Sequence, residues 1–131
     1  MHTLLIDDDA IGVFLTERLL KRESFSDNIT SFGSAEEALN FLRQAPAEEL
    51  PRVIFLDLNM PVMDGWEFLE ALRPQEAQLH GRCRIYILTS SLAQSDTARV
   101  DEFGLVAGLI HKPIDSAQIQ SVRDQMGAVE T

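Results

Sequence analysis

The hydrophobic residues of this 131-residue chain fall into short continuous runs that alternate with stretches of helical spacing. Runs of four to eight apolar residues with β-branched members predict buried strands, whereas apolar residues three and four positions apart predict amphipathic helices. Five runs of the strand type occur, at residues 3–6, 29–32, 53–56, 85–88 and 106–110. Strands and helices are therefore expected to alternate along the chain.

Capping residues indicate where several of the expected helices begin. Ser34 with Glu37 forms a capping box, Asp64-Gly65 opens a helix that ends near Pro74, and Asp115 with Gln118 caps the last helix. Residues 74–83 are expected to form a polar connection, and 93–103 a weakly amphipathic helix. The apolar positions at helical spacing are Ile11, Phe14, Leu15 and Leu19; Ala35, Ala38, Leu39 and Leu42; Phe68, Leu69 and Leu72; and Ile119, Val122 and Met126.

This alternation predicts an α/β fold in which a parallel sheet lies between two layers of helices. A chain of 131 residues, 45% of them hydrophobic, is long enough for one core of ordinary size. We therefore expect one domain over residues 1–131, without a separate output domain.

The charge balance restricts the partners. Eleven Lys and Arg against 21 Asp and Glu give a net charge of −10, which is the wrong sign for neutralising the phosphates of nucleic acid or an anionic membrane surface. No apolar segment approaches the length of a membrane span, and the chain lacks a signal-peptide pattern, so a cytoplasmic location and a protein partner are expected. The single cysteine, Cys83, is expected to be structural.

Polar residues with useful chemistry follow the expected strands. Asp7 and Asp8 come directly after the first strand, Asp57 ends the third, Thr89 ends the fourth and Lys112 ends the fifth. In a parallel α/β sheet the carboxyl ends of the strands meet at one edge, and ligands bind there. The sequence therefore predicts that these five side chains converge.

Three neighbouring carboxylates repel one another unless a cation holds them ionised. Oxygen ligands favour a hard ion, so we expect Mg²⁺, with Mn²⁺ as an alternative, bound by Asp8, Asp57 and the Asn59 backbone carbonyl, while Asp7 holds metal-bound waters. The Thr89 hydroxyl and the Lys112 ammonium would receive an incoming phosphoryl group, and Asp57 is the natural nucleophile.

These residues resemble the receiver domain of two-component response regulators. The matching motifs are Asp7-Asp8 after an apolar strand, Asp57-x-x-Met60-Pro61-x-Met63-Asp64-Gly65, Thr89-Ser90 and Lys112-Pro113, in the family's order and approximate spacing. The resemblance covers essentially the whole chain. It implies a flavodoxin-like, doubly wound (βα)5 fold with strand order 2-1-3-4-5 and a cis peptide bond between Lys112 and Pro113.

The resemblance also implies a function. Asp57 would accept a phosphoryl group from a phosphohistidine on a sensor histidine kinase or histidine phosphotransfer protein, and the receiver would catalyse only its own phosphorylation and autodephosphorylation. Its signal would pass to a downstream protein target or a self-dimer through the face formed by residues 93–103, the fifth strand and the last helix, including Leu105 and Leu109. Leu109 occupies a position where receivers commonly carry an aromatic residue.

Two alternatives remain open on the residues alone. Haloacid dehalogenase phosphatases also place Asp-x-Asp after a first strand, and Asp7-x-Asp9 fits that pattern with Asp7 as the nucleophile, but the Asp57 segment is then unexplained. A phosphorylation-independent docking module is the second alternative. The intact acidic pair, Asp57, Thr89 and Lys112 argue against it.

Overall fold

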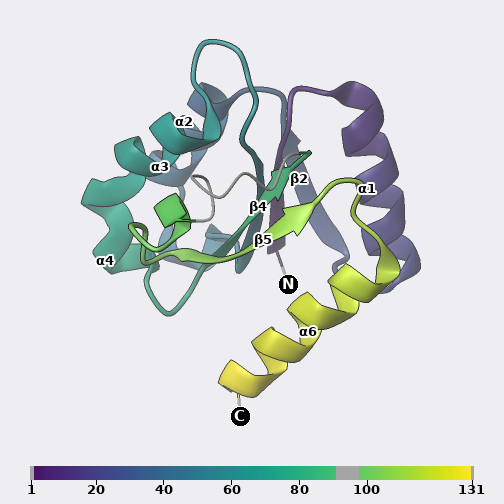
Figure 1. Ribbon diagram of the computed structural model, residues 1–131. Coiled ribbons are helices and arrows are strands. Elements are labelled where there is room, and N and C mark those ends of the chain that lie inside the picture. Colours follow the sequence, from purple (N-terminus) through teal and green to yellow (C-terminus); the bar gives the residue numbers. More distant parts are fainter. Residues whose placement is uncertain (1, 91–97, 131) are drawn as a thin grey trace.

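The computed structural model describes residues 2–90 and 98–130 and contains one five-stranded parallel sheet (Figure 1). Its strands run in the order β2-β1-β3-β4-β5, which confirms the predicted fold class and strand order. Both ends of each strand lie within one residue of their predicted positions. The strands are β1 (His2–Ile6), β2 (Asn28–Phe32), β3 (Val53–Asp57), β4 (Arg84–Thr89) and β5 (Val106–His111).

Helices cover both faces of the sheet. In Figure 1, α1 and α6 lie on one side of the strands, and α2, α3 and α4 lie on the other. Within the described residues, every helix is too short or too polar to cross a lipid bilayer. The helices are α1 (Ala10–Arg22), α2 (Ala35–Gln44), α3 (Gly65–Leu72), α4 (Glu76–Leu79) and α6 (Ser116–Glu130), with 3-10 turns η1 (Ala47–Glu49) and η2 (Arg73–Gln75).

The core is divided by the sheet into two hydrophobic clusters. Side chains alternate between the faces of a strand, so Ile54 and Leu56 of β3 join the cluster under α2 and α3, while Val53 and Phe55 join the cluster under α1 and α6. Asp57, the last residue of β3, is reached only after four fully buried apolar residues. The strand therefore holds this carboxylate at a fixed depth at the sheet edge.

The predicted capping residues do cap their helices. The Ser34 side chain accepts a hydrogen bond from the Glu37 N–H at 3.2 Å. Asp115 and Gln118 exchange side-chain-to-backbone hydrogen bonds of 2.9 Å. The predicted buried stripes of α2, α3 and α6 are buried in the structure. These parts of the sequence therefore specify both where the helices begin and which face they bury.

Three predicted features differ in the structure. The core face of α1 carries Thr16, Leu19 and Leu20, whereas Ile11, Phe14 and Leu15 are exposed. Residues 74–83 are not simply a connection, because α4 forms there and buries Leu79. Of the helix expected over 93–103, residues 93–97 lie outside the described part of the chain, and residues 98–100 are helical.

Candidate functional site

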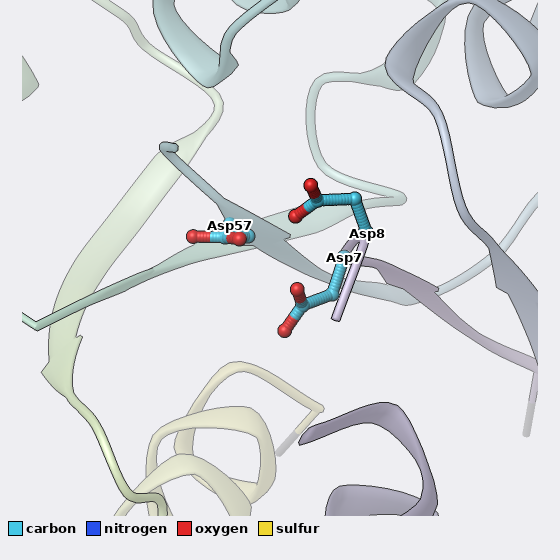
Figure 2. A group of neighbouring side chains, drawn as sticks. All are labelled: Asp7, Asp8 and Asp57. Atoms are coloured by element: carbon cyan, nitrogen blue, oxygen red, sulfur yellow. The ribbon is translucent and has the colours of Figure 1, made fainter. Parts of the chain in front are cut away.

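Three carboxylates converge at the carboxyl edge of the sheet. Asp7 follows β1 directly and Asp57 ends β3, the strand that pairs with β1. One oxygen from each of Asp7, Asp8 and Asp57 lies within 4.8 Å of the others, and Figure 2 shows Asp7 and Asp8 pointing toward Asp57. Asp7 and Asp57 are buried, with 3% and 4% of their surface exposed, whereas Asp8 is open to solvent. Two carboxylates of the cluster are thus buried, and solvent reaches the cluster from the side of Asp8.

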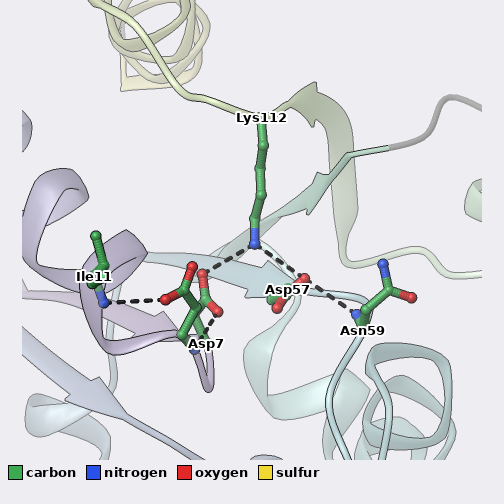
Figure 3. Close-up of polar contacts among 6 residues, drawn as sticks. Asp7, Ile11, Asp57, Asn59 and Lys112 are labelled. Atoms are coloured by element: carbon green, nitrogen blue, oxygen red, sulfur yellow. Dashed lines mark hydrogen bonds and ion pairs between the residues drawn. The ribbon is translucent and has the colours of Figure 1, made fainter.

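Lys112 supplies a positive charge to this cluster. It follows β5, and its Nζ lies 3.2 Å from Asp7 Oδ2 and 3.3 Å from Asp57 Oδ1 (Figure 3). One ammonium thereby bridges two buried carboxylates that come from different strands. The prediction that residues 7, 8, 57 and 112 come together is confirmed by this geometry.

Backbone N–H groups fix the orientation of the two buried carboxylates. Asp57 Oδ1 accepts a hydrogen bond from the Asn59 N–H at 3.2 Å, and Asp7 Oδ1 accepts one from the Asp9 N–H at 3.0 Å. Asp9 in turn caps α1 by accepting a hydrogen bond from the Ile11 N–H. Both carboxylates are therefore held by the backbone on their Oδ1 atoms.

The electrostatics of the cluster are unfavourable without an additional cation. The pKa of Asp57 is raised from 3.8 to about 6, mainly by burial and also by the neighbouring Asp7, while the Asn59 N–H and Lys112 oppose the shift. Burial lowers the pKa of Lys112, but the attraction of Asp57 and Asp7 outweighs it, so the net pKa is raised. Lys112 therefore stays protonated, while Asp57 is a carboxylate whose charge is costly.

Thr89 and Pro113 complete the same edge. Thr89 is the buried last residue of β4, one position beyond Leu88, which pairs with Asp57 in the sheet. Its carbonyl oxygen accepts a hydrogen bond of 2.8 Å from the Lys112 N–H, so β4 and β5 hold these two residues side by side. The Lys112–Pro113 peptide bond is cis, as the resemblance implied.

The donor set fits a hard divalent cation. Three carboxylates from two strand ends can each offer an oxygen to one point, and the accessible side at Asp8 leaves room for water. A doubly charged ion would also remove the cost that burial places on the Asp57 charge. The Asn59 side chain points away from Asp57 in Figure 3, so Asn59 can take part only through its backbone.

Gly65, which the sequence analysis named only as a helix start and as part of the receiver motif, is also a steric requirement of the site. Its N–H donates to the Leu58 carbonyl oxygen at 3.0 Å. A Cβ at this position would lie 2.9 Å from Leu58 Cα, which is closer than real Cβ contacts, and a tight 3.0 Å from the Asp57 carbonyl oxygen. Only glycine therefore allows α3 to start this close to the strand end that carries Asp57.

The exposed apolar surface of α1 is the second feature that the sequence analysis missed. Ile11, Phe14 and Leu15 are 72%, 55% and 59% exposed. A hollow of about 350 Å³ is lined by Ile11 and Leu15 and also by Asp7 and Lys112. The signal was present in the sequence, because apolar residues occur on more than one side of α1, and only one side can face the sheet.

Two other groups are separate from the site. Cys83 is buried, and burial raises the pKa of its thiol to about 12, which supports its structural role. Asp9 belongs to the cap of α1, whereas Asp8 is the residue that joins Asp7 and Asp57. This arrangement does not favour the phosphatase alternative, in which Asp7 and Asp9 would form the reactive pair.

Known proteins similar in sequence to this chain include a regulatory protein and a hybrid histidine kinase. Probable methanogenesis regulatory protein FilR2 of Methanothrix harundinacea is 31% identical over 101 residues, covering 73% of this chain and 62% of that protein. Hybrid signal transduction histidine kinase L of Dictyostelium discoideum is 26% identical over 125 residues, covering 95% of this chain and 7% of that protein. The chain thus spans less than two thirds of the length of these relatives.

Solved structures show the same architecture. The crystal structure of a two-component response regulator from Cytophaga hutchinsonii superposes with a TM-score of 0.87 at 27% identity, covering 97% of this chain and 96% of that chain. The sequence matches the response regulator receiver domain profile over residues 3–123, a range that includes every residue of the site. Because this match, the strand order and the convergence of Asp7, Asp8, Asp57 and Lys112 agree, the chain belongs to the response regulator receiver domain family.

Proposed function

We propose that this receiver works as a response regulator that accepts a phosphoryl group on Asp57. The observation that carries this proposal is the position of the Asp57 carboxylate, which ends a buried strand and lies beside two further carboxylates and the Lys112 ammonium. Membership of the receiver family supports the role of a phosphoacceptor in two-component signalling. The phosphorylation-independent docking module is disfavoured by the same intact cluster.

In the proposed reaction, an oxygen of Asp57 attacks the phosphorus of a phosphohistidine in line with the leaving imidazole nitrogen. The new O–P bond forms as the N–P bond breaks, and the imidazole takes up a proton from solvent. Lys112, bound to Asp57 Oδ1, spreads the charge of the transferring group, and the Thr89 hydroxyl donates to a phosphoryl oxygen. In autodephosphorylation, water attacks the phosphorus, the Asp57 O–P bond breaks, and inorganic phosphate leaves as the carboxylate is restored.

The same proposal assigns a metal site. Asp8, Asp57 and the Asn59 backbone carbonyl would hold Mg²⁺, or Mn²⁺ in its place, and Asp7 would hold the ion's water ligands. When bound, the ion neutralises the carboxylates and the phosphoryl oxygens. What supports this site is the set of three carboxylate oxygens within 4.8 Å and the buried, costly charge of Asp57.

The exposed apolar face of α1 is the proposed docking surface for the protein that donates the phosphoryl group. The hollow that Ile11 and Leu15 line also reaches Asp7 and Lys112, so a protein seated on this apolar face brings its phosphohistidine to the site. A sensor histidine kinase or a histidine phosphotransfer protein is the partner we propose. Leu15→Ser is expected to slow transfer from such a donor and to leave the reaction with acetyl phosphate unchanged, because acetyl phosphate needs no docking surface.

Output is proposed to pass through the face formed by residues 98–103, β5 and α6, reaching a downstream protein or a second copy of the receiver. β5 is the edge strand of the sheet, and Leu109 on it is only partly buried. Residues 93–97 of the predicted face lie outside the described part of the chain. Hydrogen exchange that stays unchanged in β5 and α6 on phosphorylation would count against this surface.

The decisive experiment is the intact mass after incubation with acetyl phosphate, with and without Mg²⁺, for the wild type and Asp57→Asn. A Mg²⁺-dependent gain of one phosphoryl group in the wild type alone is the expected result. A gain that persists in Asp57→Asn moves the nucleophile to another residue. If the wild type gains nothing, even when the reaction is quenched within seconds, the docking module is the better description.

A further inference from the structure

A second concentration of charge lies at the opposite edge of the sheet. Arg52, Arg82, Arg84 and His80 line one cavity of about 410 Å³ at the amino ends of β3, β4 and β5. This chain has a net charge of −10 and only 11 Lys and Arg in total. Three arginines around a single hollow are therefore a local reversal of the overall charge.

The backbone fixes where these arginines start. The Arg52 N–H donates to the His2 carbonyl oxygen, and the Arg84 N–H donates to the Arg52 carbonyl oxygen, both at 2.9 Å. Arg82 is held in a turn in which its N–H donates to Leu79, and Gly81 adopts a φ of 81° that favours glycine. Arg52 and Arg84 therefore start from hydrogen-bonded neighbouring positions, and Arg82 starts from the turn that precedes Arg84.

The described lining of the cavity supplies no counter-charge to Arg82 and Arg84, whereas Arg52 has an interaction of its own. Among the described residues that line it, none carries a carboxylate. Within the described part of the chain, Arg82 and Arg84 form no ion pair with an acidic side chain. Glu76 approaches Gly104 with one carboxylate oxygen, but Glu76 does not itself line the cavity. Guanidinium groups that share a hollow repel one another, and a bound anion relieves that repulsion.

A comparison within the molecule shows that this is unusual for its basic surface. The hollow beside α1 that contains Arg18, Lys21 and Arg22 also contains Asp115, which balances part of the charge. The described lining of the cavity at the amino edge contains no acidic residue, and like the other hollow it has an apolar wall, formed here by Leu105, Val106, Ala107 and Met126. It therefore offers two kinds of surface, one for anionic groups and one for an apolar or flat group.

We propose that this cavity binds a small organic phosphate of nucleoside diphosphate size. Guanidinium groups match the oxygens of phosphate with paired hydrogen bonds, and the apolar wall accepts the remainder of the molecule. A volume of about 410 Å³ falls within the range of small-molecule sites. β4 runs from Arg84 to Thr89, so the cavity is separated from the phosphorylation site by roughly 16 Å of strand.

The proposal is tested by titrating ADP and pyrophosphate into the full chain by calorimetry, at about 0.1 M salt and with EDTA present. Removing divalent ions keeps phosphates away from the acidic cluster. We expect saturable binding of ADP with one site per chain. The double variant Arg82→Gln/Arg84→Gln should weaken it by at least about tenfold, because two charge-assisted contacts are lost. ADP should bind more tightly than pyrophosphate, because only ADP contacts the apolar wall.

Lys21→Gln/Arg22→Gln is the matched control, because it removes the same charge from the other basic hollow. Its ADP affinity should stay within about twofold of the wild type, since long-range effects of exposed charges are screened. Equal losses in both double variants, or no saturable binding to the wild type, overturn the site. Equal affinity for ADP and pyrophosphate overturns the ligand class. Acetyl phosphate labelling of Asp57 reports separately on the proposed function, so the two proposals fail independently.

Discussion

Replacing Asp57 with asparagine is expected to stabilise the metal-free protein while abolishing its phosphorylation. The physical reason is that the folded protein buries this carboxyl group beside Asp7, which raises its pKa from 3.8 to about 6. Folding therefore costs free energy whenever Asp57 must be ionised. A pKa raised by this amount corresponds to roughly 3 kcal/mol, since each pKa unit is about 1.4 kcal/mol. Asparagine has nearly the same shape and never ionises.

The pH dependence of this effect follows from linkage. Below pH 3.8 the group is protonated in both states and folding has no such cost. As the pH rises from 3.8 to about 6, the unfolded chain releases this proton before the folded one does, so the stability of the wild type falls. At pH 7.5 the full cost is present. We therefore expect Asp57→Asn to gain about 3 kcal/mol at pH 7.5 and roughly half of that at pH 5.

The assay is urea unfolding in EDTA at both pH values, with Asp101→Asn as a control at an exposed carboxylate. The control should change the free energy of unfolding by less than about 0.5 kcal/mol. Adding Mg²⁺ at tenfold its dissociation constant should stabilise the wild type by about 1.4 kcal/mol and the Asp57→Asn variant by less. A gain of the same size at pH 5 and pH 7.5, or no gain at all, would refute the reasoning, because the effect would then not come from ionisation.

Three further predictions concern the surroundings of Asp57. Lys112→Gln should slow labelling by acetyl phosphate by on the order of 10²-fold, because a charge that stabilises the transferring group is lost, and timed mass spectra measure this. Gly65→Ala should lower the free energy of unfolding by roughly 1–3 kcal/mol in urea, because its Cβ would meet Leu58, and an unchanged stability would contradict the close approach. Trp66 stacks on Phe103 at a ring distance of 5.9 Å and follows Gly65, so phosphorylation should change the tryptophan fluorescence. Emission that stays constant while the mass shows labelling would separate Trp66 from the site.

The fold and most of the site could be predicted because their signals are local in the sequence. An unbroken apolar run that ends in a carboxylate places Asp57 at a strand end, and the same holds for Asp7 after β1. Once strands are parallel, their carboxyl ends must meet at one edge, so convergence with Lys112 follows from topology. The individual contacts, such as the bridge from Lys112 to both carboxylates, depend on how far each strand extends toward this edge of the sheet.

Features that depend on which elements pack together could not be read in the same way. α1 has apolar residues on two sides, and only its packing on the sheet shows that Leu19 and Leu20 are buried while Phe14 is not. The three arginines at the amino edge are separated by up to 32 positions, from Arg52 to Arg84, and each alone resembles an ordinary solvated residue. Their common cavity exists only because β3 and β4 are neighbours.

The charge count of the cluster supports the proposal that a metal ion is bound during phosphoryl transfer. Three carboxylates and one ammonium carry a formal charge of −2 within a few ångströms. Phosphorylation exchanges the single charge of Asp57 for about two on the phosphoryl group, so without a metal the total would become about −3 at a largely buried position. With a divalent ion the total is zero before transfer and about −1 after it. Repulsion between charges grows as water is excluded, so the metal-free reaction would have to overcome the larger electrostatic cost. The burial of Asp7 and Asp57 therefore supports the proposed dependence on Mg²⁺.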